Sequence, residues 1–149
     1  MSDALPAPTY APPFWLSHHR FEDRHRCFHI GGFHLCSRCL ATYPVLFAAL
    51  AMQLHRPMAP VSHPWDRWIL FALAAPALLD WGLGQLSSWK GRNALRFATG
   101  LLLGCSLGRA LYIHMRHPGT PLIYAYGLAL MGFAAIVWGL RQVLGSGRE

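Results

Sequence analysis

The chain has 149 residues, of which 54% are hydrophobic and only 13% are charged. This composition excludes an ordinary soluble domain and indicates an all-α integral membrane protein. The net charge of +7 does not indicate a nucleic-acid-binding protein, because the basic residues are spread over short loops rather than gathered on one helix face.

The chain begins with a proline-rich segment, residues 1–17, that is predicted to be irregular. It lacks the basic start and apolar run of a cleavable signal peptide, so the first membrane span is expected to act as its own signal. Residues 18–39 then concentrate three of the four cysteines and several histidines. We interpret this second segment as a separate Cys/His metal-binding hairpin.

The sequence predicts a β-hairpin in this segment. Two short strand-like runs, Cys27–Ile30 and Phe33–Cys36, flank the pair Gly31-Gly32. A two-residue Gly-Gly loop suits a primed hairpin turn, in which the central residues need positive φ. Counting outwards from the loop pairs the first residue of the hairpin with the last, and side chains alternate between faces with period two. One face is therefore expected to carry Cys27, His29, His34 and Cys36.

This arrangement offers more thiol and imidazole ligands than a tetrahedral metal ion needs. The C-x-x-C pair, Cys36 and Cys39, lets two thiolates grip one ion, and Cys27 is the expected third ligand. The fourth is one of four histidines: His18, His19, His29 or His34. Zinc is the expected metal and iron the second choice, while a redox-active dithiol or inert thiols remain alternative interpretations.

Four apolar runs are long enough, or nearly long enough, to cross a hydrocarbon core of about 30 Å, which takes roughly 20 helical residues. They are predicted at Cys39–Leu54, Trp68–Leu86, Ala94–Ile113 and Tyr124–Leu140. The sequence therefore predicts a four-helix transmembrane bundle over residues 39–140, followed by a tail, residues 141–149.

The distribution of basic residues predicts the orientation of the bundle. Nine of the thirteen lysines and arginines fall on the side that carries the two termini and the hairpin. The positive-inside rule then places both termini and the hairpin in the cytoplasm. A reducing compartment favours metal-bound thiolates over a disulfide. On the exterior side, histidines and methionines could bind copper, although ordinary loop residues are the simpler interpretation.

One carboxylate, Asp80, lies inside the second predicted span, where it should be paired or functional. Its predicted partner is Arg96, which begins the third span near the same side of the membrane. Gln85 and Asn93 are expected to give further polar support on that side. The sequence thus predicts a buried polar cluster beneath the cysteine hairpin.

The third span carries a stripe of small residues. Glycine recurs every four residues, at Gly100, Gly104 and Gly108. Such a stripe lets another helix approach closely. We expect this face to contact other membrane-protein subunits.

Several short motifs mark the polar positions of the chain: a leading HHR, a CSRC followed by Tyr43, Asp80 with Gln85, and RNALRFATGLLLG in the third span. Over about residues 18–108 they resemble the uncharacterised bacterial and archaeal membrane-protein family called domain of unknown function 2085. The resemblance carries over, residue by residue, to Cys36, Cys39, Tyr43, Asp80, Gln85, Asn93, Arg96, Thr99 and Gly100.

The chain departs from the family pattern at two ligand positions. The leading cysteine of the family is replaced by His18 or His19, and a serine is replaced by Cys27. The hairpin is also shorter, without the proline that precedes the C-x-x-C pair in the family. If the replaced positions bind metal, the mixture of cysteine and histidine ligands differs here. The resemblance implies a membrane fold and a site, but no activity.

These features together predict a small multi-pass protein of the inner membrane of a bacterium or archaeon. Its cytoplasmic Cys/His metal site is expected to make it an accessory protein or subunit of a larger membrane complex. One alternative is a membrane metal-dependent enzyme that uses Asp80 and Arg96, although no general base lies at a diagnostic spacing from the ligands. The other is a quinone-linked thiol-disulfide oxidoreductase that uses Cys36 and Cys39, which would require a second cysteine pair.

Overall fold

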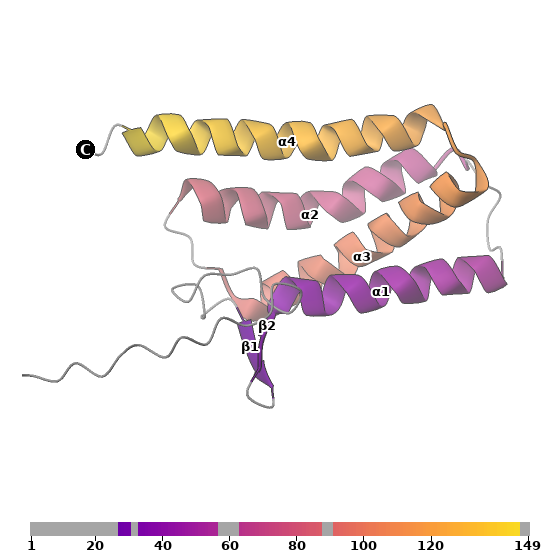
Figure 1. The fold of residues 1–149 in the computed structure, drawn as a ribbon, viewed down its shortest axis with the longest axis horizontal. Coiled ribbons are helices and arrows are strands. Elements are labelled where there is room, and N and C mark those ends of the chain that lie inside the picture. Colours follow the sequence, from indigo (N-terminus) through magenta and orange to yellow (C-terminus); the bar gives the residue numbers. More distant parts are fainter. Residues whose placement is uncertain (1–26, 31–32, 57–62, 88–90, 147–149) are drawn as a thin grey trace, which may run out of the picture.

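The computed structural model describes residues 27–30, 33–56, 63–87 and 91–146. Two short strands precede four helices (Figure 1): β1 (Cys27–Ile30), β2 (Phe33–Cys36), α1 (Ser37–His55), α2 (Asp66–Leu86), α3 (Asn93–Arg116) and α4 (Pro121–Ser146). The helices run alternately up and down, so α1 and α3 begin at the end that carries the hairpin, and α2 and α4 end there. We call this the hairpin end of the bundle.

The third helix is the centre of the molecule. It packs along α1 on one side and against α2 on the other, whereas α4 lies at the edge and packs mainly against α2 (Figure 1). One buried hydroxyl links three of these helices. The Ser106 Oγ of α3 donates to the Leu70 carbonyl of α2 at 2.7 Å, and lies 2.7 Å from the Tyr126 hydroxyl of α4.

The hairpin has the register that the sequence predicts. The strands are antiparallel, with Cys27 opposite Cys36 and His29 opposite His34. The predicted Gly-Gly loop lies outside the described residues. On the side of the bundle, the Phe28 ring of β1 meets the Phe97 ring of α3 edge-on, with the ring centroids 6.2 Å apart. This contact seats the hairpin on the start of α3.

Three of the four helices are long and apolar enough to cross a membrane: α2, α3 and the part of α4 from Pro121 to Leu144. The first helix forms where the first span was predicted, but its 19 residues do not meet these limits. Its polar residues lie near the two ends, with Arg38 in the first turn and Gln53 and His55 in the last. Three of the four predicted spans are therefore supported by length and composition.

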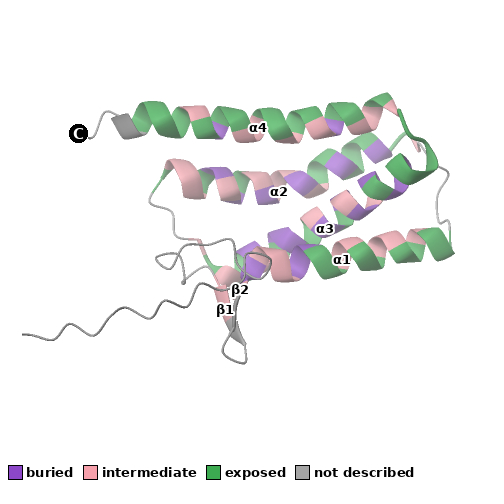
Figure 2. Cartoon of the chain, viewed as in Figure 1, coloured by how far each residue is buried: buried purple, intermediate pink, exposed green. Residues whose placement is uncertain are grey.

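Large apolar residues are exposed on the outer surface of all four helices. Most residues of α4 are exposed (Figure 2). Leu128, Met131 and Val143 are each at least 70% exposed. A water-soluble monomer rarely leaves so continuous an apolar surface uncovered. A lipid environment suits this surface, because apolar side chains are favourable in contact with hydrocarbon chains. The backbone groups of the helices are hydrogen-bonded within each helix and need no water.

The glycine stripe of α3 faces α1 of the same chain, so the expectation that it contacts another subunit is wrong. A Cβ atom added at Gly104 would lie 2.7 Å from the Thr42 carbonyl oxygen, and one at Gly108 would lie 2.9 Å from the Leu46 carbonyl oxygen. The Thr42 hydroxyl also donates to the Gly100 carbonyl at 3.1 Å. The spacing predicts a close helix contact correctly, but it does not specify which helix makes it.

Candidate functional site

Three cysteines meet where the hairpin joins the bundle. Cys27 begins β1, Cys36 ends β2, and Cys39 lies in the first turn of α1. The side chains of Cys36 and Cys39 are hydrogen-bonded to each other, and Cys27 is close enough to act electrostatically on Cys39. Cys36 is only 4% exposed, and none of the three cysteines forms a disulfide. The three predicted thiol ligands thus lie near one another at the junction.

Local geometry explains this meeting. Antiparallel pairing sets the first and last residues of the hairpin side by side. The chain then turns directly from β2 into α1, so Cys39 follows Cys36 by about one helical turn. Cys36 is the N-cap residue of α1, and its own side chain makes no capping hydrogen bond. A negative charge is favoured there, because the first N–H groups of a helix lack intrahelical partners and the helix dipole is positive at this end.

The four histidines proposed as ligands lie where the structure gives no side-chain description. His18 and His19 precede the described residues, and only the backbone of His29 and His34 is described. Among the side chains that the structure does describe, no group of three or more histidine, cysteine, aspartate or glutamate residues could hold a metal ion. The metal site therefore stays a prediction.

A buried cluster of charges lies beneath the cysteines. The Asp80 side chain of α2 is 4% exposed, and its Oδ2 contacts the Arg38 Nη2 of α1 directly and the Arg96 Nε of α3 at 3.9 Å. The predicted pair of Asp80 and Arg96 is present, but the sequence analysis missed Arg38. The available signal was its position: Arg38 begins the first helix at the same end of the bundle as Asp80.

The other two predicted polar residues differ in position. The Asn93 Nδ2 donates to the Cys27 carbonyl at 3.5 Å, a long hydrogen bond that connects α3 to β1. Gln85 instead accepts a hydrogen bond from Arg141 of α4 at 2.7 Å. Five residues advance a helix by about 500°, which places Gln85 roughly 140° around α2 from Asp80. Gln85 is therefore not part of the cluster beneath the cysteines.

A second buried charge pair lies at the opposite end of the bundle. The Arg109 guanidinium of α3 donates from Nε and Nη2 to the two carboxylate oxygens of Asp66 of α2, at 2.8 and 2.9 Å. Its Nη1 donates to the Gln53 Oε1 of α1 at 3.0 Å. This network was not predicted, because the second span was expected to begin at Trp68, whereas α2 begins at Asp66. The network joins three helices and leaves the charges well paired.

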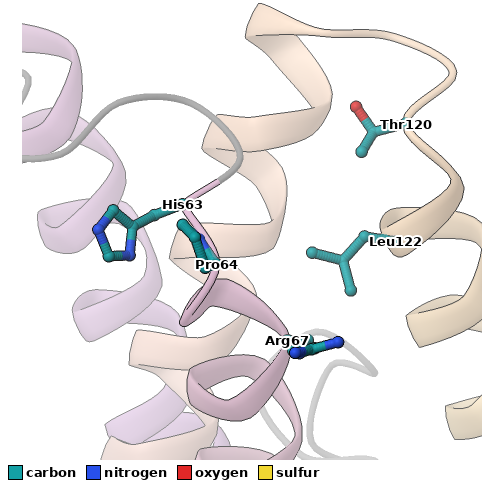
Figure 3. A pocket seen from close by; sticks show the side chains of 5 residues that line it. All are labelled: His63, Pro64, Arg67, Thr120 and Leu122. Atoms are coloured by element: carbon teal, nitrogen blue, oxygen red, sulfur yellow. The ribbon is translucent and has the colours of Figure 1, made fainter.

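A pocket of about 340 Å³ lies at this same end (Figure 3), lined by His63, Pro64, Arg67, Thr120 and Leu122. Its only described cation is Arg67, whose guanidinium lies over the Trp68 ring at 5.5 Å from the ring centroid. None of the described residues that line it is a cysteine or carries a carboxylate. The cysteine junction is the stronger candidate site.

The fold and the junction define a multi-pass helical membrane protein that carries a cysteine-bearing hairpin at one end of its bundle. The family model described as "Predicted membrane protein (DUF2085)" matches residues 19–110. This match covers well over half of the chain, so the protein belongs to that family and the resemblance is confirmed. No curated protein and no solved structure matches the chain.

Proposed function

We propose that the protein is a four-span membrane protein that holds a zinc ion at its hairpin end and serves as an accessory protein or subunit of a larger membrane complex. The observation that carries this proposal is the meeting of Cys27, Cys36 and Cys39 at the junction of β1, β2 and α1. The three thiols come from three elements and lie close in space, although Cys27 is distant from the other two along the chain. Such a set is typical of a folded zinc site.

Cysteine and histidine, the residue types at and near the junction, are those that bind zinc in proteins. A mutual hydrogen bond between Cys36 and Cys39 means that one metal ion could reach both sulphurs with little rearrangement. His29 and His34 occupy opposite positions of the hairpin, two residues from Cys27 and Cys36 respectively. The hairpin is one of the segments that could supply the fourth ligand. Iron is the second choice, since it accepts the same ligands.

A structural role suits this site better than catalysis. When bound by four protein ligands, zinc supplies a fixed cross-link between the hairpin and the bundle. A metal-dependent enzyme would need a base beside the metal, but Asp80 is already held by Arg38 and Arg96. A thiol-disulfide oxidoreductase would need a second cysteine pair. The remaining cysteine, Cys105, lies about 13 Å along α3 from Arg96, at 1.5 Å per residue.

The metal content of the purified protein tests this proposal. Elemental analysis of the protein in detergent is expected to give about one zinc ion per chain. Cys36→Ser and Cys39→Ser should each remove the zinc, because each deletes a thiolate of the central pair. Cys105→Ser is the matched control and should retain it. A metal-free wild-type protein whose Cys36 and Cys39 react with maleimide only after reduction would contradict the proposal and favour the oxidoreductase.

The proposal includes α1 as the fourth span, with the hairpin and both termini in the cytoplasm. α1 packs along α3, which is long and apolar enough to cross the membrane, through the close approach at Gly104 and Gly108. A helix in contact with a spanning partner over several turns is expected to span with it. The asymmetry of lysine and arginine favours the inside position of the hairpin.

Reporter fusions test this topology. A reporter after Glu149 should indicate the cytoplasm, and one inserted within residues 57–64 should indicate the exterior, because α1 separates the second site from the hairpin. The matched comparison is an insertion within residues 88–90, which should again indicate the cytoplasm. Signals from the same side at residues 57–64 and 88–90 would show that α2 fails to span, and a reversed pattern would place the hairpin outside.

A further inference from the structure

Arg38 stands between Cys36 and Cys39 and is held by two other helices. Its guanidinium contacts the Asp80 carboxylate of α2. Its carbonyl oxygen lies against α3, where a Cβ atom added at Gly100 would come within 2.8 Å of it. The turn that carries the C-x-x-C pair is therefore fixed at its middle residue, through both backbone and side chain.

Cys27 is tied to the bundle as well. Its carbonyl oxygen accepts the hydrogen bond from Asn93 at the start of α3. The neighbouring ring of Phe28 packs edge-on against Phe97, one turn further along the same helix. The segments that carry all three cysteines are thus positioned by residues of α2 and α3 that are not themselves ligands.

We propose that Asp80 is a positioning residue for the metal site: it acts through Arg38 to fix the turn between Cys36 and Cys39. This inference rests on the proposed zinc site and adds the residues that support it. Groups that orient metal ligands from behind are worth about 10- to 100-fold in metal affinity. The burial of Asp80 in the bundle is then explained by its contact with Arg38, which positions the turn between the two cysteines.

The test measures zinc affinity of the full-length protein in detergent by competition with a chromophoric chelator. Asp80→Asn should weaken zinc binding by about 10- to 100-fold, because an amide holds the Arg38 guanidinium less firmly than a carboxylate does. Asp80→Glu should restore most of the affinity. Combining Asp80→Asn with Arg38→Gln should weaken binding by much less than the product of the two single effects, because both act through one contact.

The matched control is Asp66→Asn, which changes the other buried aspartate of α2 at the far end of the bundle. It should lower thermal stability but leave zinc affinity unchanged. If Asp66→Asn weakens zinc binding as much as Asp80→Asn does, the role of Asp80 is only structural and the inference is wrong. If Asp80→Asn binds zinc like the wild type while Cys36→Ser binds none, the inference fails and the proposed function stands. A wild-type protein that binds no zinc overturns both.

Cobalt substitution tests the three thiol ligands of the proposed zinc site separately. Co²⁺ bound in place of zinc gives a thiolate-to-metal absorption band whose intensity rises with the number of thiolates. Cys27→Ser should reduce this band by about one third, since one of three thiolates is lost. An unchanged band in Cys27→Ser would show that only Cys36 and Cys39 supply sulphur, and would contradict the three-thiolate set.

Discussion

Replacing Gly104 by leucine is expected to separate α1 from α3 and to destabilise the folded protein by on the order of 3 kcal/mol. A Cβ atom at this position would lie 2.7 Å from the Thr42 carbonyl oxygen and 2.9 Å from the Val45 Cβ. The first of these neighbours is backbone, which cannot rotate away as a side chain can. The whole of α1 would have to move outwards, and the packing on both sides of the contact would be lost. Thermal unfolding in detergent, followed by tryptophan fluorescence, measures the effect.

The control for this prediction is Gly132→Leu in α4. Apart from its chain neighbours and the backbone of its own helix, no described atom lies within 4 Å of a Cβ added at Gly132, so leucine there should extend into detergent or lipid. Its unfolding temperature should equal or exceed that of the wild type, because glycine is a poor helix former. Similar unfolding temperatures for Gly104→Leu and Gly132→Leu would show that α1 and α3 are not in close contact.

The second large effect is expected from Asp66 and Arg109. Asp66 is 1% exposed and is held by two charge-assisted hydrogen bonds from Arg109. Asp66→Ala should cost about 3 to 5 kcal/mol, because it leaves a partly buried guanidinium without its carboxylate. Adding Arg109→Leu should recover part of the loss, since the double variant has no uncompensated charge. Thermal unfolding in the same detergent measures all variants.

Arg67→Ala is the comparison for that prediction, because Arg67 also lies in the first turn of α2. It is exposed and rests on the Trp68 ring, so its loss should cost less than about 1 kcal/mol. If the double variant were as unstable as the sum of the single variants, Asp66 and Arg109 would not be interacting partners.

The features that the sequence predicts correctly are those set by neighbouring residues. The hairpin register depends only on the period of two and on the position of the Gly31-Gly32 loop, so counting along the chain is enough. The helices follow from apolar runs of sufficient length. Asp80 and Arg96 are found together because both are charged residues near the same end of adjacent predicted spans. None of these inferences requires knowledge of how the helices are arranged.

The features that the sequence analysis missed depend on that arrangement. Which helix receives the glycine stripe is decided by tertiary packing, and α1 rather than a second subunit occupies it. The contact of Arg38 with Asp80 was not predicted, because it joins residues 42 positions apart in the sequence. Gln85 could have been excluded from the cluster by its angle around α2. The metal ligands themselves stay a prediction because the histidine side chains are not described.

The pairing of α1 with α3 also has a consequence for how the protein is made. The ribosome synthesises α1 first, but α3, against which α1 packs, is complete only after residue 116 has been synthesised. Until then Gln53 of α1 lacks the Arg109 guanidinium that binds it in the folded protein. Contacts between segments so far apart in sequence form late. The nascent chain therefore passes through a stage at which α1 is complete but has no contact with α3.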